Sequence, residues 1–209
     1  MQMKRIFILL FLSISFICCN SNERNPSKKN EIINNIASDT TSSQTSDISE
    51  EKLMVGKRIY GDFNGDSKYE YAYVEFLKEV NGPTPQDDNG TYPIFAIKFS
   101  DEEIPPFDIG CCEATLINEG DLNNDGSDEI SIFQSPMNGC TYVWRTINLK
   151  NDTAYNIFEL FLIPTGCDSE ITEDYLQNIV TLEDGKVYYK EKDPNDENVH
   201  KREAILLTK

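Results

Sequence analysis

After residue 50, apolar and polar residues follow one another in short runs that are separated by turn-forming residues. Runs of this kind, rich in β-branched and aromatic side chains, are typical of β-strands. We predict strands near Leu53–Tyr60, Tyr71–Glu79, Ile94–Ser100, Ala114–Asn118, Glu129–Phe133, Tyr142–Leu149, Ala154–Ile163, Ile179–Leu182, Lys186–Lys190 and Ala204–Thr208.

The segments between these runs carry recognisable turn signals. Asp184-Gly185 is a strong signal for a type I′ hairpin, because both of its central residues tolerate positive φ. Residues 150–152 (Lys-Asn-Asp) predict a second hairpin, and the Gly- and Pro-rich residues 81–91 predict a long exposed loop.

One helix is predicted over Ser169–Asn178. Ile171, Tyr175 and Ile179 are spaced four apart and would share one face, and Asp168 or Ser169 would cap the start. The fold class is therefore mainly β, with compact antiparallel sheets and at most one short helix.

The N-terminus predicts export. Lys4 and Arg5 precede an apolar run, Ile6–Cys19, that is shorter than the about 20 residues of a membrane-spanning helix. Two cysteines, Cys18 and Cys19, stand where this run ends.

This arrangement resembles a bacterial lipoprotein signal, in which the cysteine after the apolar run is lipidated and becomes the first mature residue. Cys19 is favoured because the small Cys18 precedes it, whereas the bulky Ile17 precedes Cys18. The resemblance implies a signal peptide at residues 1–18, with Cys19 lipidated and Cys18 as the alternative. It also implies a lipid anchor in the bacterial cell envelope, on the outer membrane or cell surface. Periplasmic and surface-facing orientations both stay open.

Residues 19–50 form the next segment, which is rich in Ser, Thr and Asn and has no aromatic residue. Such a composition buries too little apolar surface to offset the entropy of ordering. We therefore predict a lipidated, disordered tether at residues 19–50 and a β domain at residues 51–209.

Two segments of this domain repeat the pattern Gly-Asp-apolar-Asn-x-Asp-x-x-x-Glu-apolar, beginning at Gly61 and Gly120. A hard cation such as Ca²⁺ takes six to eight oxygen ligands, which alternate residues of a tight loop can supply. The candidate ligands are side chains at positions 1, 3, 5 and 9 and the carbonyl of position 7: Asp62, Asn64, Asp66, Lys68 and Glu70 in the first segment, and Asp121, Asn123, Asp125, Ser127 and Glu129 in the second.

Two other interpretations of these loops are an EF-hand and a pair of turns without a metal. An EF-hand needs a Glu at position 12, where this chain has Tyr73 and Ile132. Alternatively, Asp and Asn at this spacing form Asx-turns between two strands without any metal.

The repeated pattern resembles the FG-GAP or VCBS-type repeats of integrin-like propellers and bacterial surface proteins. The resemblance covers about 25 residues around each loop. It implies a structural Ca²⁺ between two strands, and Gly126 in the second loop fits it better than Ser67 in the first. Two repeats are too few to close a propeller without leaving long strand edges unpaired. We therefore expect a sandwich or a truncated, propeller-like arrangement.

Four cysteines lie in the domain: Cys111, Cys112, Cys140 and Cys167. An even number in an exported domain predicts disulfides rather than zinc ligands. Cys140–Cys167 is the favoured bridge, because the two residues flank the open end of the hairpin predicted around residues 150–152. Cys111 and Cys112 then pair with each other, or one of them bonds elsewhere.

Composition narrows the function. Lys+Arg total 19 against 36 Asp+Glu, for a formal net charge of −17, which excludes binding to nucleic acid through phosphate neutralisation. The chain has one histidine, His200, and no nucleophile motif, phosphate loop or dinucleotide fingerprint, so we do not expect an enzyme. Acid runs such as Asp101–Glu103 are typical of solvated loop charge.

These observations predict a lipid-anchored envelope or cell-surface module that binds an unknown protein or glycan partner, or acts structurally, with calcium-stabilised loops. A carboxylate-dependent secreted hydrolase is one alternative, and it requires two acids converging in a pocket outside the repeats. A carbohydrate-binding lipoprotein is another, and it requires Trp144 and neighbouring tyrosines exposed in a row.

Overall fold

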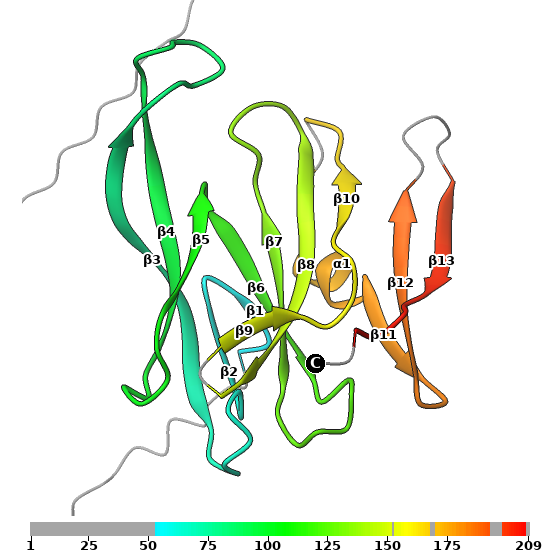
Figure 1. Ribbon diagram of the computed structural model, residues 1–209. Helices are drawn as coiled ribbons and strands as arrows, with labels where there is room; N and C mark the ends of the chain where they lie inside the picture. The colour runs from blue at the N-terminus through cyan, green and yellow to red at the C-terminus, as the bar shows by residue number, and fades with distance from the viewer. Residues whose placement is uncertain (1–52, 152, 168–169, 193–197, 208–209) are drawn as a thin grey trace, which may run out of the picture. The chain divides into compact units, whose positions relative to one another are not determined.

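The computed structural model shows three antiparallel sheets and one short helix (Figure 1). Of the described residues, 54% are in strands and 3% in a helix, so the mainly β prediction is confirmed. The predicted signal peptide, Cys18, Cys19 and the tether lie outside the described residues. The structure describes residues 53–151, 153–167, 170–192 and 198–207.

Sheet B has the order β2-β3-β4-β5. Its strands are β2 (Arg58–Gly61), β3 (Glu70–Asn81), β4 (Thr91–Phe99) and β5 (Phe107–Cys111).

Sheet A has the order β1-β6-β7-β8-β10, and β9 also pairs with β8. Its strands are β1 (Val55–Gly56), β6 (Ala114–Gly120), β7 (Glu129–Gln134), β8 (Thr141–Lys150), β9 (Thr153–Asn156) and β10 (Phe161–Pro164).

Sheet C has the order β11-β12-β13, with β11 (Val180–Glu183), β12 (Lys186–Lys192) and β13 (Val199–Glu203). Helix α1 (Glu173–Gln177) precedes it, and Thr172 caps this helix by accepting a hydrogen bond from the Tyr175 N–H. No helix within these described residues is long enough to cross a bilayer.

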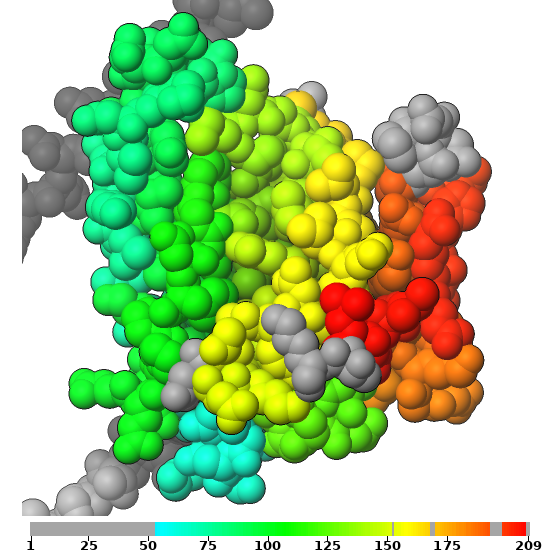
Figure 2. Space-filling view, in the orientation of Figure 1, coloured from blue at the N-terminus to red at the C-terminus, as the bar shows by residue number. Residues whose placement is uncertain are grey.

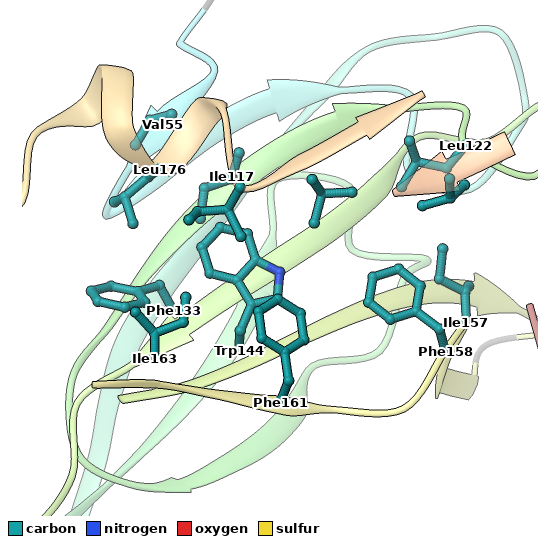
Figure 3. Packing of buried hydrophobic residues seen from close by; sticks show 13 residues of the cluster. Val55, Ile117, Leu122, Phe133, Trp144, Ile157, Phe158, Phe161, Ile163 and Leu176 are labelled. Carbon is teal, nitrogen blue, oxygen red and sulfur yellow. The ribbon is translucent and has the colours of Figure 1, made fainter. Parts of the chain in front are cut away.

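Sheet A buries both of its faces, because it lies between the other two sheets (Figure 1). On one face, Ile130 and Ile132 of β7 join a core with residues of sheet B. On the other face, Phe133 and Trp144 join a core with residues of sheet C and α1; Figure 3 shows Trp144 in the middle of that core. All six residues of β7 are buried, as expected for a strand covered on both sides.

Most strand predictions are confirmed, but the predicted strand Leu53–Tyr60 is two strands. Gly56, the last residue of β1, adopts φ +145°, and the chain passes there from sheet A to sheet B. Ala154–Ile163 is likewise two strands, because Ile157 and Phe158 leave the sheet to bury their side chains in the core.

One strand was missed and one predicted strand is wrong. Strand β5 was not predicted, because Asp108 and Gly110 are residues that strands disfavour, and Gly110 takes φ +78° there. Residues 204–207 are not a strand, and Thr208 lies outside the described residues. The strand nearest to this segment is β13, which ends just before it and forms an edge of sheet C. Its charged side chains make ion pairs with neighbouring strands, such as Arg202–Glu191.

The turn prediction at Asp184-Gly185 is confirmed. Asp184 and Gly185 both have positive φ, at 51° and 75°, and join β11 to β12 as a type I′ turn requires. Helix α1 falls inside the predicted Ser169–Asn178 but is shorter, and the predicted caps Asp168 and Ser169 lie outside the described residues.

Candidate metal centre

The two repeated segments form matching loops, which we call loop 1 (Asp62–Glu70) and loop 2 (Asp121–Glu129). Each loop leaves a strand at a glycine and ends where its Glu begins the next strand, β3 or β7. The apolar residue at position 2 anchors each loop: Phe63 is buried in the core with sheet B, and Leu122 in the core with sheet C.

The carboxylate at position 1 shapes both loops. Asp62 accepts hydrogen bonds from the backbone N–H groups of Gly65, Asp66 and Ser67 at 2.8–3.1 Å. Asp121 accepts from Asp125 and Gly126 at 3.1 and 2.9 Å. These are Asx-type turn bonds, so they account for the shape of the loops with or without a metal.

The glutamate at position 9 links the end of each loop to its start. Glu70 accepts a hydrogen bond from the Phe63 N–H at 2.7 Å, and Glu129 accepts one from the Leu122 N–H at 2.6 Å. Desolvation by burial raises the pKa of Glu70 and of Glu129 to about 7, although these hydrogen bonds oppose the shift. A buried carboxylate of this kind needs a compensating positive charge or further donors.

Loop 2 gathers its carboxylates. Oxygen atoms of Asp121, Asp125 and Glu129 lie within 4.8 Å of one another, and they form the one such group found among the described residues. Burial opposes ionisation of Asp125, but hydrogen bonds from Ser127, Asn123 and other groups outweigh it and lower its pKa. Asp125 is therefore ionised at neutral pH beside Glu129, whose pKa is about 7.

Amide groups surround the Glu129 carboxylate. Asn123 donates its Nδ2 to Glu129 Oε1 at 2.6 Å, and Asn148 of β8 donates to the same oxygen at 2.6 Å. The amide oxygens of both asparagines, Asn123 Oδ1 and Asn148 Oδ1, are buried and accept no hydrogen bond. Buried acceptors without partners are uncommon and are a known feature of sites that take an ion.

Loop 1 is arranged differently. The Lys68 ammonium pairs with Asp66 at 2.8 Å, and this hydrogen bond lowers the pKa of Asp66. Asp101, which follows β4, approaches Asn64 with its Oδ2 at 3.5 Å from the Asn64 Nδ2. The ammonium group of Lys68 therefore pairs with the carboxylate of Asp66, which the sequence pattern predicted to be a metal ligand.

The two loops lie side by side (Figures 1 and 2). The Asp128 N–H donates to the Asp62 carbonyl at 2.7 Å, and the Asp62 N–H donates to the Asp128 carboxylate at 3.2 Å. Asn118 joins them by donating to both the Tyr60 carbonyl and Asp128. Gly61 leaves room for this contact, because a Cβ there would lie 2.3 Å from Asn118 Nδ2.

Sequence reasoning missed three participants. Asn148 and Asp101 reach the loops from the neighbouring strand or its end, and Glu119 lies at the end of β6, where burial raises its pKa to about 8. The Oε1 of Glu119 is also buried without a hydrogen-bond partner. For Asn148 and Asp101 the sequence spacing from the loops carries no signal, because strand pairing brings them there, whereas Glu119 lies two residues before Asp121.

The cysteine pairs lie at disulfide distance. Cys140 and Cys167 have Cα atoms 5.2 Å apart at the end of the β8–β10 pair, as the hairpin argument predicted. Cys111 and Cys112 pair with each other, with Cα atoms 3.7 Å apart. Gln134 holds this turn by donating to the carbonyls of both residues.

Comparison with known proteins adds no relative: no protein family, curated protein or solved structure matches the chain.

Proposed function

We propose that loop 2 binds Ca²⁺ as a structural ion, and that the chain is a lipid-anchored module of the bacterial envelope whose partner is a protein or a glycan. The observation that carries the calcium proposal is the convergence of Asp121, Asp125 and Glu129 within 4.8 Å. The buried, unpartnered oxygen of Asn123, a residue at ligand position 3, supports it.

The chemistry of these donors favours Ca²⁺ over other metals. Each candidate ligand is an oxygen of a carboxylate, an amide or a backbone carbonyl, and such ligands suit hard cations. Ca²⁺ accepts six to eight of them in flexible geometry, whereas Mg²⁺ demands near-ideal octahedral geometry. The ligands would be Asp121, Asn123, Asp125, Glu129 and the carbonyl of Ser127.

An ion at loop 2 would be structural. It would offset the charge of Glu129, which is fully buried, and would tie the end of β6 to the start of β7. Loop 1 is the second candidate, through Asp62, Asn64, Asp66, Glu70 and the carbonyl of Lys68.

A calcium titration of thermal stability tests this proposal. Extracellular calcium modules bind with Kd of about 10⁻⁴–10⁻³ M, so several millimolar Ca²⁺ should raise the Tm by about 3–6 °C. Asp125→Asn should lose most of that rise, while the matched Asp66→Asn in loop 1 should keep it. An unchanged Tm of the natural protein at 10 mM Ca²⁺ would rule out the calcium proposal.

The anchor rests on the N-terminal sequence alone. Labelling with a palmitate analogue should mark the natural protein and Cys18→Ala, and should fail to mark Cys19→Ala. If Cys18→Ala alone loses the label, Cys18 is the lipidated residue. If the natural protein takes no label, the lipid anchor is wrong.

The alternatives gain less support from the described residues. Trp144 is fully buried, so it cannot belong to an exposed aromatic row for sugar binding. Three cavities among the described residues each carry a pair of acids, but one acid of each pair is ion-paired: Glu113 with Lys57, Glu191 with Arg202, and Glu203 with Lys186. The carboxyl groups with raised pKa lie at the loops instead. A hydrolase site therefore has no supporting geometry in this part of the chain.

A further inference from the structure

The pairing of β7 with β8 brings a residue from outside the repeat to loop 2. Ile130 pairs with Ile147, so the next step along the ladder places Asn148 opposite Glu129. Asn148 is 1% exposed, and its amide points into loop 2.

The Asn148 amide lies at the centre of a group of loop 2 oxygens. Its Nδ2 is 2.6 Å from Glu129 Oε1, 3.0 Å from Asp125 Oδ2 and 3.0 Å from Ser127 Oγ. An amide nitrogen carries two hydrogens, so it cannot satisfy three acceptors at full strength. The oxygen of the same amide, Asn148 Oδ1, is buried and accepts no hydrogen bond.

A half-turn of this amide exchanges its nitrogen and oxygen without moving the rest of the side chain. The oxygen would then stand close to the oxygens of Asp125, Ser127 and Glu129. Four oxygens that approach one another repel unless a cation lies among them, and such a cluster is what a Ca²⁺ ligand shell consists of.

The same register recurs at loop 1. Tyr71 and Ser100 are joined by two hydrogen bonds, at 2.8 and 2.9 Å, so the next step places Asp101 opposite Glu70. Asp101 also approaches Asn64 of that loop. Both loops thus receive an oxygen-bearing side chain from the strand that follows in the sheet, although the sequence separations differ.

We propose that the cation site is completed across the sheet, with Asn148 supplying a side-chain oxygen from β8 to the ion at loop 2. This rests on the proposed calcium binding at that loop. One ion would then tie together three neighbouring strands, through Asp121 after β6, Glu129 on β7 and Asn148 on β8. Asp101 is the structural counterpart of Asn148 at loop 1.

Calorimetric Ca²⁺ titration of the purified full chain tests this with three variants. Asn148→Ala should weaken binding by about 10–100-fold, the range seen when groups that orient or complete a metal site are removed. Asn148→Asp keeps the oxygen and adds a charge, so it should bind at least as tightly as the natural protein. Asn178→Ala, whose side chain bonds Asp174 and neither loop, is the control and should bind unchanged.

The Asn148→Asp variant shows whether Asn148 acts as an oxygen ligand of the ion or only as a hydrogen-bond donor. If Asn148 acted only by donating its N–H groups, a carboxylate there would repel Asp125 and Glu129, and Asn148→Asp would bind worse than Asn148→Ala. That order would overturn the proposal, as would unchanged affinity in Asn148→Ala. If Asn148→Ala does not fold, as judged by Trp144 fluorescence, Asn148→Asp alone decides. If the natural protein binds no Ca²⁺, the proposed function itself fails, which is a distinguishable result.

Discussion

Loop 1 and loop 2 share one sequence pattern and one backbone course, yet they balance their carboxylates differently. In loop 1, the Lys68 ammonium pairs with Asp66. In loop 2, Asp125 receives hydrogen bonds from Ser127 and Asn148, which carry no charge. The repeated pattern therefore builds the turn, whereas the residues at position 7 and on the next strand decide how much negative charge is left for an ion.

The loops also differ at position 6, where the backbone takes positive φ in both. Gly126 adopts φ +96° in loop 2 without a Cβ, whereas Ser67 holds φ +67° in loop 1. A non-glycine residue in this region carries some backbone strain. At position 4 the order is reversed, with Gly65 at φ +74° in loop 1 and Asn124 at φ +60° in loop 2, so each loop holds one glycine and one other residue in this region.

The largest difference should appear when the position 9 glutamates are removed. Glu129 accepts hydrogen bonds from Leu122, Asn123 and Asn148, whereas the structure gives Glu70 one such bond, from Phe63. Each buried donor left without a partner costs about 1–3 kcal/mol. Glu129→Ala should therefore lose about 3 kcal/mol of unfolding free energy and Glu70→Ala about 1–2 kcal/mol, measured by urea denaturation with a chelator present.

The isosteric change Glu129→Gln is the control for this pair, because it keeps the side-chain volume while removing the charge. It should fold more stably than Glu129→Ala and still fail to bind the ion. An equal loss of stability in Glu129→Ala and Glu70→Ala would contradict the difference between the loops.

The next effect is a dependence of stability on pH in the presence of chelator. The pKa values of Glu129 and Glu119 are raised to about 7 and 8 by burial, above the value of about 4.3 for an unfolded chain. The folded state therefore binds more protons than the unfolded state. The contribution of these two groups to stability is fully present below about pH 4.3 and is lost as the pH rises through 7–8. The Tm should drop by several °C between pH 5 and pH 8.

Saturating Ca²⁺ should reduce this drop, because the ion favours the ionised form of Glu129. Glu129→Gln should reduce it more than Glu70→Gln, because the charge of Glu129 also raises the pKa of Glu119. A Tm that rises steadily from pH 5 to pH 8 under chelator would contradict the assignment of buried, protonated carboxyl groups.

The smallest effect concerns Lys68. Lys68→Ser gives loop 1 the residue that loop 2 has at position 7 and removes the ion pair with Asp66. Exposed pairs contribute little, so the affinity of loop 1 for Ca²⁺ should rise only modestly, up to about fivefold, measured by NMR titration of the Gly65 amide. Lys78→Ser removes the same charge from β3 outside the loop and should leave that affinity almost unchanged. Equal gains in both variants would show a general charge effect rather than release of Asp66.

Much of this structure follows from local sequence. The Asp184-Gly185 turn, most of the strands and the turns of the repeated Asp-x-Asn-x-Asp pattern depend on neighbouring residues, and they are found where the sequence predicts them. The pairing of Cys140 with Cys167 depends only on one hairpin, so it could also be predicted from the sequence. Strand β5 was missed because sheet pairing, not local propensity, stabilises it.

The candidate site was predicted only in part, for a related reason. The turn residues of both loops follow from the repeat, but Asn148 and Asp101 do not, because their positions depend on the length of the hairpin between paired strands. The β3–β4 hairpin is longer than the β7–β8 hairpin, so the equivalent residues fall at different separations from Glu70 and Glu129. The pairing of Lys68 with Asp66 was likewise not visible, because position 7 was considered only for its carbonyl.

The central claim is that Ca²⁺ binds loop 2 in preference to loop 1, and amide NMR during a Ca²⁺ titration tests it most directly. Each loop contains one glycine, Gly65 in loop 1 and Gly126 in loop 2, whose amide signal reports on its own loop. The account predicts that the Gly126 signal shifts first, with a midpoint of about 10⁻⁴–10⁻³ M, and that Gly65 responds only at higher concentration. If neither signal moves at 10 mM Ca²⁺, or if Gly65 moves first, the account is contradicted.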